Sequence, residues 1–150
     1  MEQQFNWGII GLGKIANKFA QDLSGLANAK LHAVASRSLD KAQAFAERYK
    51  APHAFGSYEE LVQCPDLDAV YIATPHMLHK ENTLLCLEHG IAVLCEKPFA
   101  MNTKQVEAMI QKAKEKETFL MEALWTRFLP TTLKALSLIE PSVISLSHVR

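Results

Sequence analysis

Gly11, Gly13 and Ala16 follow the pattern G-x-G-x-x-A within the stretch GIIGLGKIA at 8–16. This spacing suits a pyrophosphate, because Gly11 permits a tight turn and Gly13 lets the backbone approach the phosphates. Ala16 is small enough for the following helix to lie close to the strand, and the helix start adds free N–H groups. A plain glycine turn is the alternative. The pattern predicts a dinucleotide site made by Gly11, Leu12, Gly13, Lys14 and Ile15.

The end of the second predicted strand, KLHAVAS at 30–36, indicates which dinucleotide would bind. NAD sites usually carry Asp or Glu about 20 residues beyond the glycines, but Ser36 and Arg37 occur here, with no acid between Asp22 and Asp40. Ser36 can hydrogen-bond a 2′-phosphate, and Arg37 can pair with it and stack on adenine. The sequence therefore predicts NADP, with NAD less favoured. The alternative is that Arg37 is one solvated charge among many.

The stretch AVLCEKPFA at 92–100 is an apolar run that ends abruptly in Glu96, Lys97 and Pro98. A strand that enters a core commonly ends in a turn of Gly, Asn or Ser. Here two opposite charges stand at its end, and the proline restricts the backbone. A surface ion pair that closes the strand is the plainer interpretation of these charges.

Two histidines follow another apolar run, DAVYIAT at 68–74. His76 and His79 are one helical turn apart and can share a face. The pair could be half of a metal site, but no third ligand is suggested nearby, so no metal is predicted. A histidine that only packs within a helix is an equal alternative for His79.

The elements that must position these residues alternate along the chain. Strands are expected at 5–10, 30–36, 53–55, 68–74, 91–95 and 119–124. Helices are expected at 14–24, after Ser38, after the S-x-x-E box that begins at Ser57, at 77–89, after Asn102 or Thr103, and from Pro130 to about 139. Continuous apolar strands that alternate with helices predict an α/β fold with a doubly wound, mostly parallel sheet, the Rossmann dinucleotide-binding fold.

Residues 1–140 are expected to form this one domain. The last segment, SVISLSHVR at 142–150, alternates apolar and polar residues as in a sheet with one wet face. We expect residues 141–150 to begin a second α/β domain, the substrate domain, which the chain does not finish.

Composition excludes several partners. The 16 basic and 16 acidic residues give zero net charge, which gives no electrostatic reason to expect nucleic acid or a membrane surface. No apolar run is long enough for a membrane span, and the N-terminus lacks the pattern of a signal peptide. Cys64, Cys86 and Cys95 have no metal-like spacing and are predicted to be buried free thiols, which fits the cytoplasm.

Taken together, five motifs resemble the Gfo/Idh/MocA oxidoreductase family: G-L-G-K-I-A (11–16), S-R (36–37), A-T-P-H-x-x-H (73–79), E-K-P (96–98) and W-T-R-F-L-P (125–130). The run MEALWTRFLP at 121–130 is most similar to the branch of dihydrodiol dehydrogenases and NADP-linked D-xylose dehydrogenases. The resemblance spans roughly residues 5 to 130.

The resemblance implies roles for particular residues. Lys97 would be catalytic, polarising a substrate oxygen beside the nicotinamide, while Glu96 orients it and the bond before Pro98 is cis. The remaining implied cofactor contacts are Thr74, Pro75, His76, His79, Glu96, Lys97, Trp125 and Arg127. Core packing is an even alternative for Trp125.

The resemblance also implies an activity, an NADP-dependent dehydrogenase that moves hydride between nicotinamide and a sugar or diol carbon. The substrate would be a small molecule, the full-length protein a homo-oligomer, and this chain alone inactive. The alternative is a non-catalytic NADP-binding or sensor module, which would have no need of Lys97. A methyltransferase-like nucleotide site is disfavoured, because Ser36 and Arg37 stand where it would need an acid.

Overall fold

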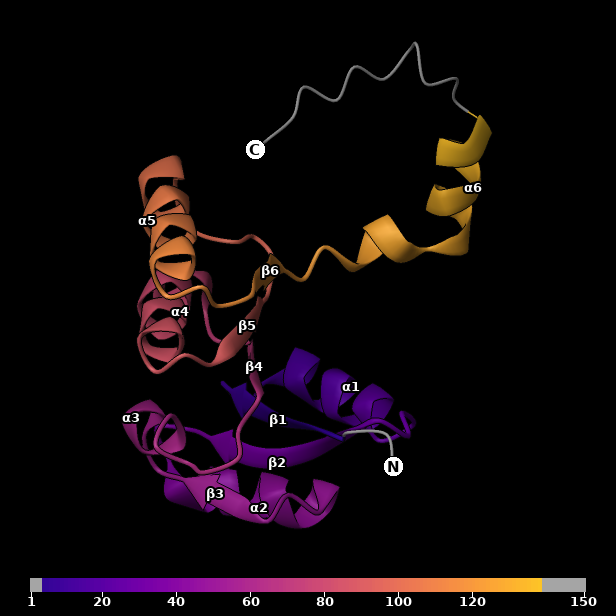
Figure 1. The fold of residues 1–150 in the computed structure, drawn as a ribbon. Coiled ribbons are helices and arrows are strands. Elements are labelled where there is room, and N and C mark those ends of the chain that lie inside the picture. Colours follow the sequence, from indigo (N-terminus) through magenta and orange to yellow (C-terminus); the bar gives the residue numbers. More distant parts are fainter. Residues whose placement is uncertain (1–3, 139–150) are drawn as a thin grey trace.

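The fold, known from a computed structural model that describes residues 4–138, is built on one parallel sheet (Figure 1). Its six strands lie in the order β3-β2-β1-β4-β5-β6. Their bounds are β1 (Phe5–Ile10), β2 (Ala29–Ala35), β3 (His53–Phe55), β4 (Ala69–Ile72), β5 (Ala92–Cys95) and β6 (Leu120–Glu122). This order confirms the doubly wound sheet that the alternating pattern predicts.

Helices cover both faces of the sheet because successive crossovers run in two directions from its centre. The helices are α1 (Lys14–Leu23), α2 (Leu39–Tyr49), α3 (Tyr58–Leu61), α4 (His79–Glu88), α5 (Thr103–Glu115) and α6 (Pro130–Leu138), with short 3₁₀ segments η1 (His76–Leu78) and η2 (Trp125–Phe128). Helices α1 and α2 bury Ala16, Ala20 and Phe45 against one face of the sheet. Helices α3, α4 and α5 bury Leu61, Leu87 and Met109 against the other.

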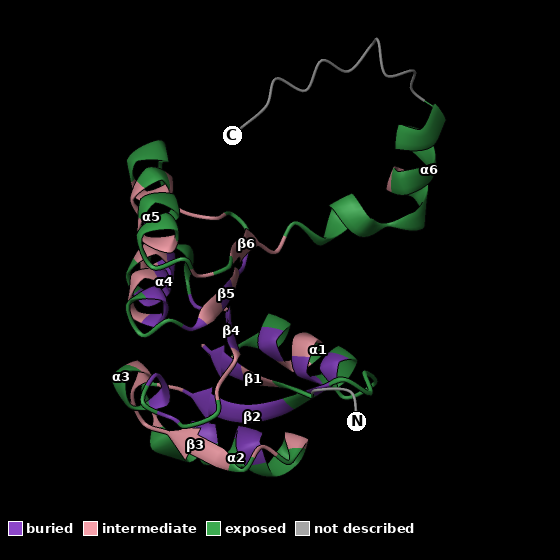
Figure 2. Ribbon diagram, in the orientation of Figure 1, coloured by how far each residue is buried: buried purple, intermediate pink, exposed green. Residues whose placement is uncertain are grey.

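The buried residues therefore form two layers, one on each side of the strands (Figure 2). The strands supply both layers by alternation, since Ile9 belongs to the layer under α1 and Ile10 to the opposite one. Between β1 and β4 the winding direction reverses. In such sheets the crevice at the carboxyl ends of the strands, at this reversal, is where ligands bind.

Two of the three predicted helix caps form as expected. The Asn102 side chain accepts a hydrogen bond from the Gln105 N–H at 3.1 Å, and Ser57 accepts one from the Glu60 N–H at 3.2 Å. The Glu60 carboxylate in turn accepts from the Gly56 N–H at 3.2 Å. Ser38 stands at the cap position of α2, but its side chain makes no capping bond.

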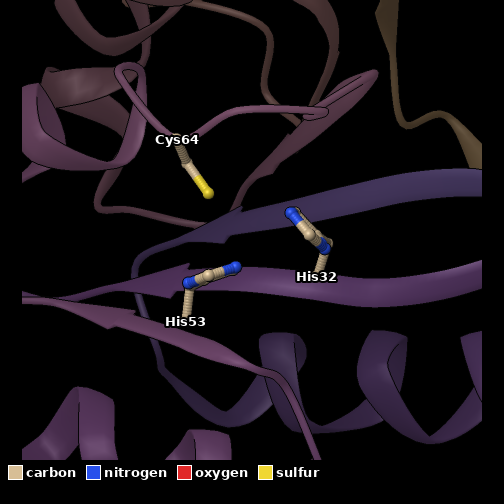
Figure 3. A group of neighbouring side chains, drawn as sticks. All are labelled: His32, His53 and Cys64. Atoms are coloured by element: carbon tan, nitrogen blue, oxygen red, sulfur yellow. The ribbon is translucent and has the colours of Figure 1, made fainter.

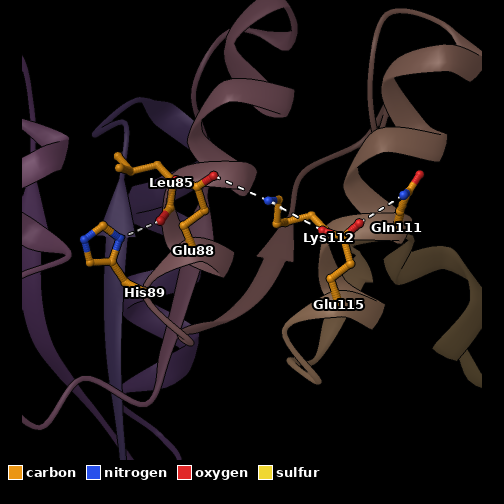
Figure 4. A network of polar contacts seen from close by, with 6 residues as sticks. All are labelled: Leu85, Glu88, His89, Gln111, Lys112 and Glu115. Carbon is orange, nitrogen blue, oxygen red and sulfur yellow. Dashed lines mark hydrogen bonds and ion pairs between the residues drawn. The ribbon is translucent and has the colours of Figure 1, made fainter.

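Helices α4 and α5 lie side by side and are joined by charged side chains (Figure 4). Lys112 lies 3.5 Å from Glu88 on α4 and 3.6 Å from Glu115 on its own helix. Exposed pairs of this kind contribute little, typically under about 1 kcal/mol.

The structure differs from the sequence prediction in one turn. The helix expected at 77–89 is divided, because the Leu78 N–H bonds back to Pro75 O at 2.9 Å as a 3₁₀ turn and the α-helix begins at His79. The strand expected at 142–150, and with it the domain division at 140, lies outside the described residues. Within residues 4–138, no helix has both the length and the hydropathy to cross a bilayer.

Candidate functional site

Four loops begin at the same level of the sheet, at the carboxyl ends of β1, β4, β5 and β6. In each case the first residue after the strand still donates its N–H to the neighbouring strand, so the hydrogen-bond ladder extends one residue into the loop. The bonds are Gly11 N–H to Ala35 O (3.2 Å), Ala73 N–H to Ile10 O (2.8 Å), Glu96 N–H to Ile72 O (3.0 Å) and Ala123 N–H to Cys95 O (2.7 Å). Ser36 N–H bonds similarly to Phe55 O at 3.2 Å. All five predicted motifs therefore start from this one edge.

In the first loop, Gly11 is required by the packing of the fold, whereas Gly13 is not. Gly11 has φ +86°, and a Cβ there would lie 2.8 Å from backbone atoms of Ala73 and Thr74, so the fold itself demands glycine. A Cβ at Gly13 would meet no described atom within 4 Å. Gly13 also begins α1 without a side-chain cap, so the first N–H groups of the helix are left for another acceptor. This open, donor-rich surface fits a phosphate group.

We expect Gly11→Ala to destabilise the chain by at least about 2 kcal/mol, because it combines an unfavourable φ with a clash against backbone. Gly90→Ala is the matched control. Gly90 has φ +70° but open space around it, so its substitution should cost only about 1 kcal/mol. Urea denaturation of both variants measures the difference. Equal losses would mean that the close approach at Gly11 is unimportant.

Ser36 and Arg37 lie where β2 ends, beside the glycine loop. The Ser36 hydroxyl accepts a hydrogen bond from the Ser38 N–H at 3.3 Å, which shapes the turn. Arg37 is exposed, so its guanidinium is available to a ligand. It lies near Tyr58, where burial raises the pKa of the phenol and the positive charge of Arg37 lowers it.

The loop that follows β5 is held by buried side chains. Glu96 is buried and accepts a hydrogen bond from the Tyr71 hydroxyl and another from the Lys97 N–H, the latter at 3.0 Å. Burial and the bond to Glu96 raise the pKa of Tyr71 well above its usual range, so this hydroxyl remains a donor. Glu96 thus holds the backbone of Lys97, and no Glu96–Lys97 ion pair occurs among the described residues. The ion-pair alternative for this stretch does not hold.

Two further contacts fix the next two residues of this loop. The Pro98 carbonyl oxygen lies 2.9 Å from His79 Nδ1, and the Phe99 N–H donates to Glu122 at 2.9 Å. The Lys97–Pro98 bond is cis, as expected. The backbone is therefore held at Lys97, Pro98 and Phe99, while the Lys97 side chain is exposed.

His79 joins this loop to the turn after β4. Its ring is fully buried, with Nδ1 facing Pro98 O and Nε2 facing Thr74 O, each at 2.9 Å. Carbonyl oxygens only accept, so each of these contacts is a hydrogen bond when the facing ring nitrogen carries its proton. His79 is thus a bridge between two loops rather than a side chain that is free to touch a cofactor.

The other predicted residues divide into buried and accessible ones. Thr74 is buried, and its hydroxyl accepts from Asn82 at 3.1 Å. Pro75 and His76 are exposed. Trp125 and Arg127 are exposed on η2, and Trp125 borders an apolar groove of about 580 Å³ between α1 and η2. Core packing of Trp125 is therefore wrong for the described residues.

The three cysteines are buried free thiols, as predicted. Burial raises the pKa of both Cys86 and Cys95 to about 12. Cys95 precedes Glu96 directly, but a protonated buried thiol is a poor nucleophile. The exposed ammonium of Lys97 is therefore the group at this strand end that could act on a ligand.

Tyr71 and Glu122 were missed by the sequence prediction as parts of this site. Tyr71 reads as one more apolar residue in a buried strand, and Glu122 as a charge at a strand end. Only the proximity of β4, β5 and β6 brings Tyr71 to the Glu96 carboxylate and Glu122 to the Phe99 N–H. A buried phenol needs a partner, which is the one signal that the sequence offered for Tyr71.

Comparison with known proteins identifies the family to which this arrangement belongs. Residues 5–124 match the family described as "Oxidoreductase family, NAD-binding Rossmann fold" (GFO_IDH_MocA). A trans-1,2-dihydrobenzene-1,2-diol dehydrogenase of Mus musculus is 48% identical over 126 residues, which is 83% of this chain and 38% of that protein. The protein of the same name from Danio rerio is 45% identical over 141 residues, or 92% of this chain and 42% of that protein.

Solved structures agree with the fold. A 3-ketoreductase from Actinomadura kijaniata, solved in complex with NADP and TDP-benzene, superposes with a TM-score of 0.85 at 30% identity. The match covers 90% of this chain and 42% of that protein. The chain thus spans about two fifths of the length of these relatives. With four fifths of its residues matched by one family, the chain belongs to the Gfo/Idh/MocA oxidoreductases and carries their NAD-binding Rossmann fold.

Proposed function

We propose that this chain is the NADP-binding part of a dehydrogenase that transfers hydride between nicotinamide and a sugar or diol carbon. The observation that carries the proposal is the loop at 96–99. Its backbone is fixed at three successive residues by Glu96, His79 and Glu122, yet it presents an exposed lysine at the ligand-binding edge of the sheet. A non-catalytic binding module would have no use for an exposed lysine whose backbone is held so firmly.

Different residues at this edge of the sheet would bind different parts of the dinucleotide. Gly13 and the free N–H groups at the start of α1 would bind the pyrophosphate, and Ser36 and Arg37 the adenine ribose end. Pro75, His76, Trp125 and Arg127 would line the other end, while the buried Thr74 and His79 shape it from behind. When bound, the dinucleotide supplies a hydride donor or acceptor.

Lys97 would donate a hydrogen bond to the substrate oxygen and help move its proton. The ammonium can do this because the Lys97 backbone is fixed while its side chain reaches outward. Glu96 acts through the backbone, so its role is to position Lys97. The names of the dihydrodiol dehydrogenases support a diol as substrate, and the sugar alternative rests on the resemblance of residues 121–130.

The rest of the proposal concerns the longer protein. Residues 1–140 would be its cofactor domain and 141–150 the beginning of a substrate domain, in a cytoplasmic homo-oligomer. Hydride transfer requires the substrate carbon within about 3–3.5 Å of the nicotinamide, with water excluded. We expect that the second domain supplies this cover, so that the chain of 150 residues binds the cofactor without turnover.

We expect this chain to bind NADP more tightly than NAD, because Arg37 can pair with the 2′-phosphate and no acid occurs at the end of β2, at 36–39, to repel it. Calorimetric titration with each cofactor tests this. Arg37→Ala should weaken NADP binding by about 1.5–3 kcal/mol, roughly 10- to 150-fold, and weaken NAD binding much less, since NAD loses only the stacking on adenine. NAD is therefore an internal control for folding. Equal affinities of the unaltered chain for the two cofactors would contradict the proposal of NADP.

A further inference from the structure

A second group of reactive side chains lies away from the carboxyl edge. His32 on β2, His53 at the start of β3 and Cys64 after α3 come together, and one ligand atom of each lies within 4.8 Å of the other two. Figure 3 shows both imidazoles and the thiol turned toward a common space. The three residues are far apart in the sequence, and the adjacency of β2 and β3 unites them.

A bulge in β2 gives His32 its position. Trp7 on β1 pairs with Leu31, whereas Gly8 pairs with Ala33, so His32 is an extra residue in the ladder. Bulges of this kind re-aim a side chain and are frequent beside functional sites.

The polar atoms of this cluster are poorly satisfied as they stand. His32 is nine-tenths buried, and one ring nitrogen, Nε2, lies 3.1 Å from Pro65 O. The Cys64 thiol points to the same carbonyl at 3.7 Å. The other nitrogen of His32, Nδ1, is buried without a partner within the described part of the chain. A buried polar group without a partner costs stability.

We propose that His32, His53 and Cys64 form a Zn²⁺ site, with two imidazole nitrogens and one thiolate as protein ligands. Nitrogen and sulfur are the donors that Zn²⁺ prefers. Three atoms at most 4.8 Å apart share a centre about 2.8 Å away or less, and zinc bonds are about 2.0–2.3 Å. Side-chain shifts of under about 1 Å would therefore close the site. His53 is only partly buried, so water can reach the fourth position.

The protons balance in this binding step. Zn²⁺ displaces the thiol proton of Cys64 to solvent, and each imidazole coordinates in its neutral form, with its proton on the other ring nitrogen. The Pro65 carbonyl, which His32 Nε2 and the Cys64 thiol both face, loses the thiol as a donor, so the bonds to the ion must outweigh this loss. The ion would join β2, β3 and the segment before β4, which makes its expected role structural. The sequence predicted no metal, and here the proposal departs from it.

Zinc titration of the tag-free chain tests the site directly. We expect one Zn²⁺ per chain, a rise in melting temperature with zinc, and, with Co²⁺ as a probe, a thiolate-to-cobalt charge-transfer band. Cys64→Ser should abolish this band, and His53→Gln should weaken zinc binding at least about tenfold. His53 is partly exposed, so its variant should still fold.

His76→Gln is the matched control, because His76 is exposed and follows β4 at its carboxyl end, whereas Cys64 precedes that strand, and the variant should bind zinc like the unaltered chain. Absence of stoichiometric binding would overturn the proposal. So would binding that survives both Cys64→Ser and His53→Gln, since the ion would then be held elsewhere. Neither result depends on the proposed dehydrogenase activity.

Discussion

Replacing Lys97 by alanine should lower kcat of the proposed full-length dehydrogenase by about 10²–10⁴-fold, the usual contribution of a positioned general acid or base. The side chain is exposed, while the backbone of its loop is held by Glu96, His79 and Glu122, so the fold does not depend on the ammonium. Steady-state rates with a diol or sugar substrate measure the loss, and urea denaturation of the 150-residue chain should be unchanged.

Lys104→Ala controls for the loss of one positive charge. Lys104 is exposed in the first turn of α5 and should leave the rate unaffected. The cofactor affinity of the 150-residue chain should also survive Lys97→Ala within about threefold, which separates the chemical step from cofactor binding. An active Lys97→Ala enzyme would refute the catalytic role while leaving the NADP proposal intact.

Replacing His79 by alanine should destabilise the chain by about 3–5 kcal/mol. The change removes a fully buried ring, leaves a cavity, and deprives Thr74 O and Pro98 O of their donors. Each unpaired buried carbonyl costs about 1–3 kcal/mol, and large-to-small core changes add a cavity term of similar size. Chemical denaturation measures the loss.

His76→Ala is the control from the adjacent turn, because His76 is exposed and should change stability by less than about 0.5 kcal/mol. A His79→Ala variant as stable as the original would contradict the bridging role.

The sequence predicted the strands well because each is a short apolar run between turn residues. The runs at 5–10 and 53–55 match β1 and β3 exactly, and the others differ at their ends by one or two residues. The site loops were also predictable, since parallel strands bring their carboxyl ends to one edge. The topology alone therefore predicts that Gly11, Ser36 and Lys97 lie at the same edge. No contact between their side chains has to be predicted for this.

What the sequence could not predict are bonds from side chains to distant backbone atoms. His79 and Pro98 are 19 residues apart, and Glu122 and Phe99 are 23 apart. Nearly every residue carries a backbone carbonyl and N–H, so the sequence pattern does not indicate which of them will be the partner of a given side chain. The division of the helix at His79 has the same origin, since the ring must face two loops that only the folded sheet brings together.

Gly11 is required by the fold, whereas Gly13 is proposed to be required by the ligand, so selection for folding and selection for binding should act on different positions. In a library randomised at both positions and sorted only for soluble, folded chains, Gly11 should be retained while position 13 drifts toward alanine and serine. Sorting the same library for retention on an immobilised dinucleotide should restore glycine at 13. Glycine at position 11 would thus be required by folding alone, and glycine at position 13 by ligand binding.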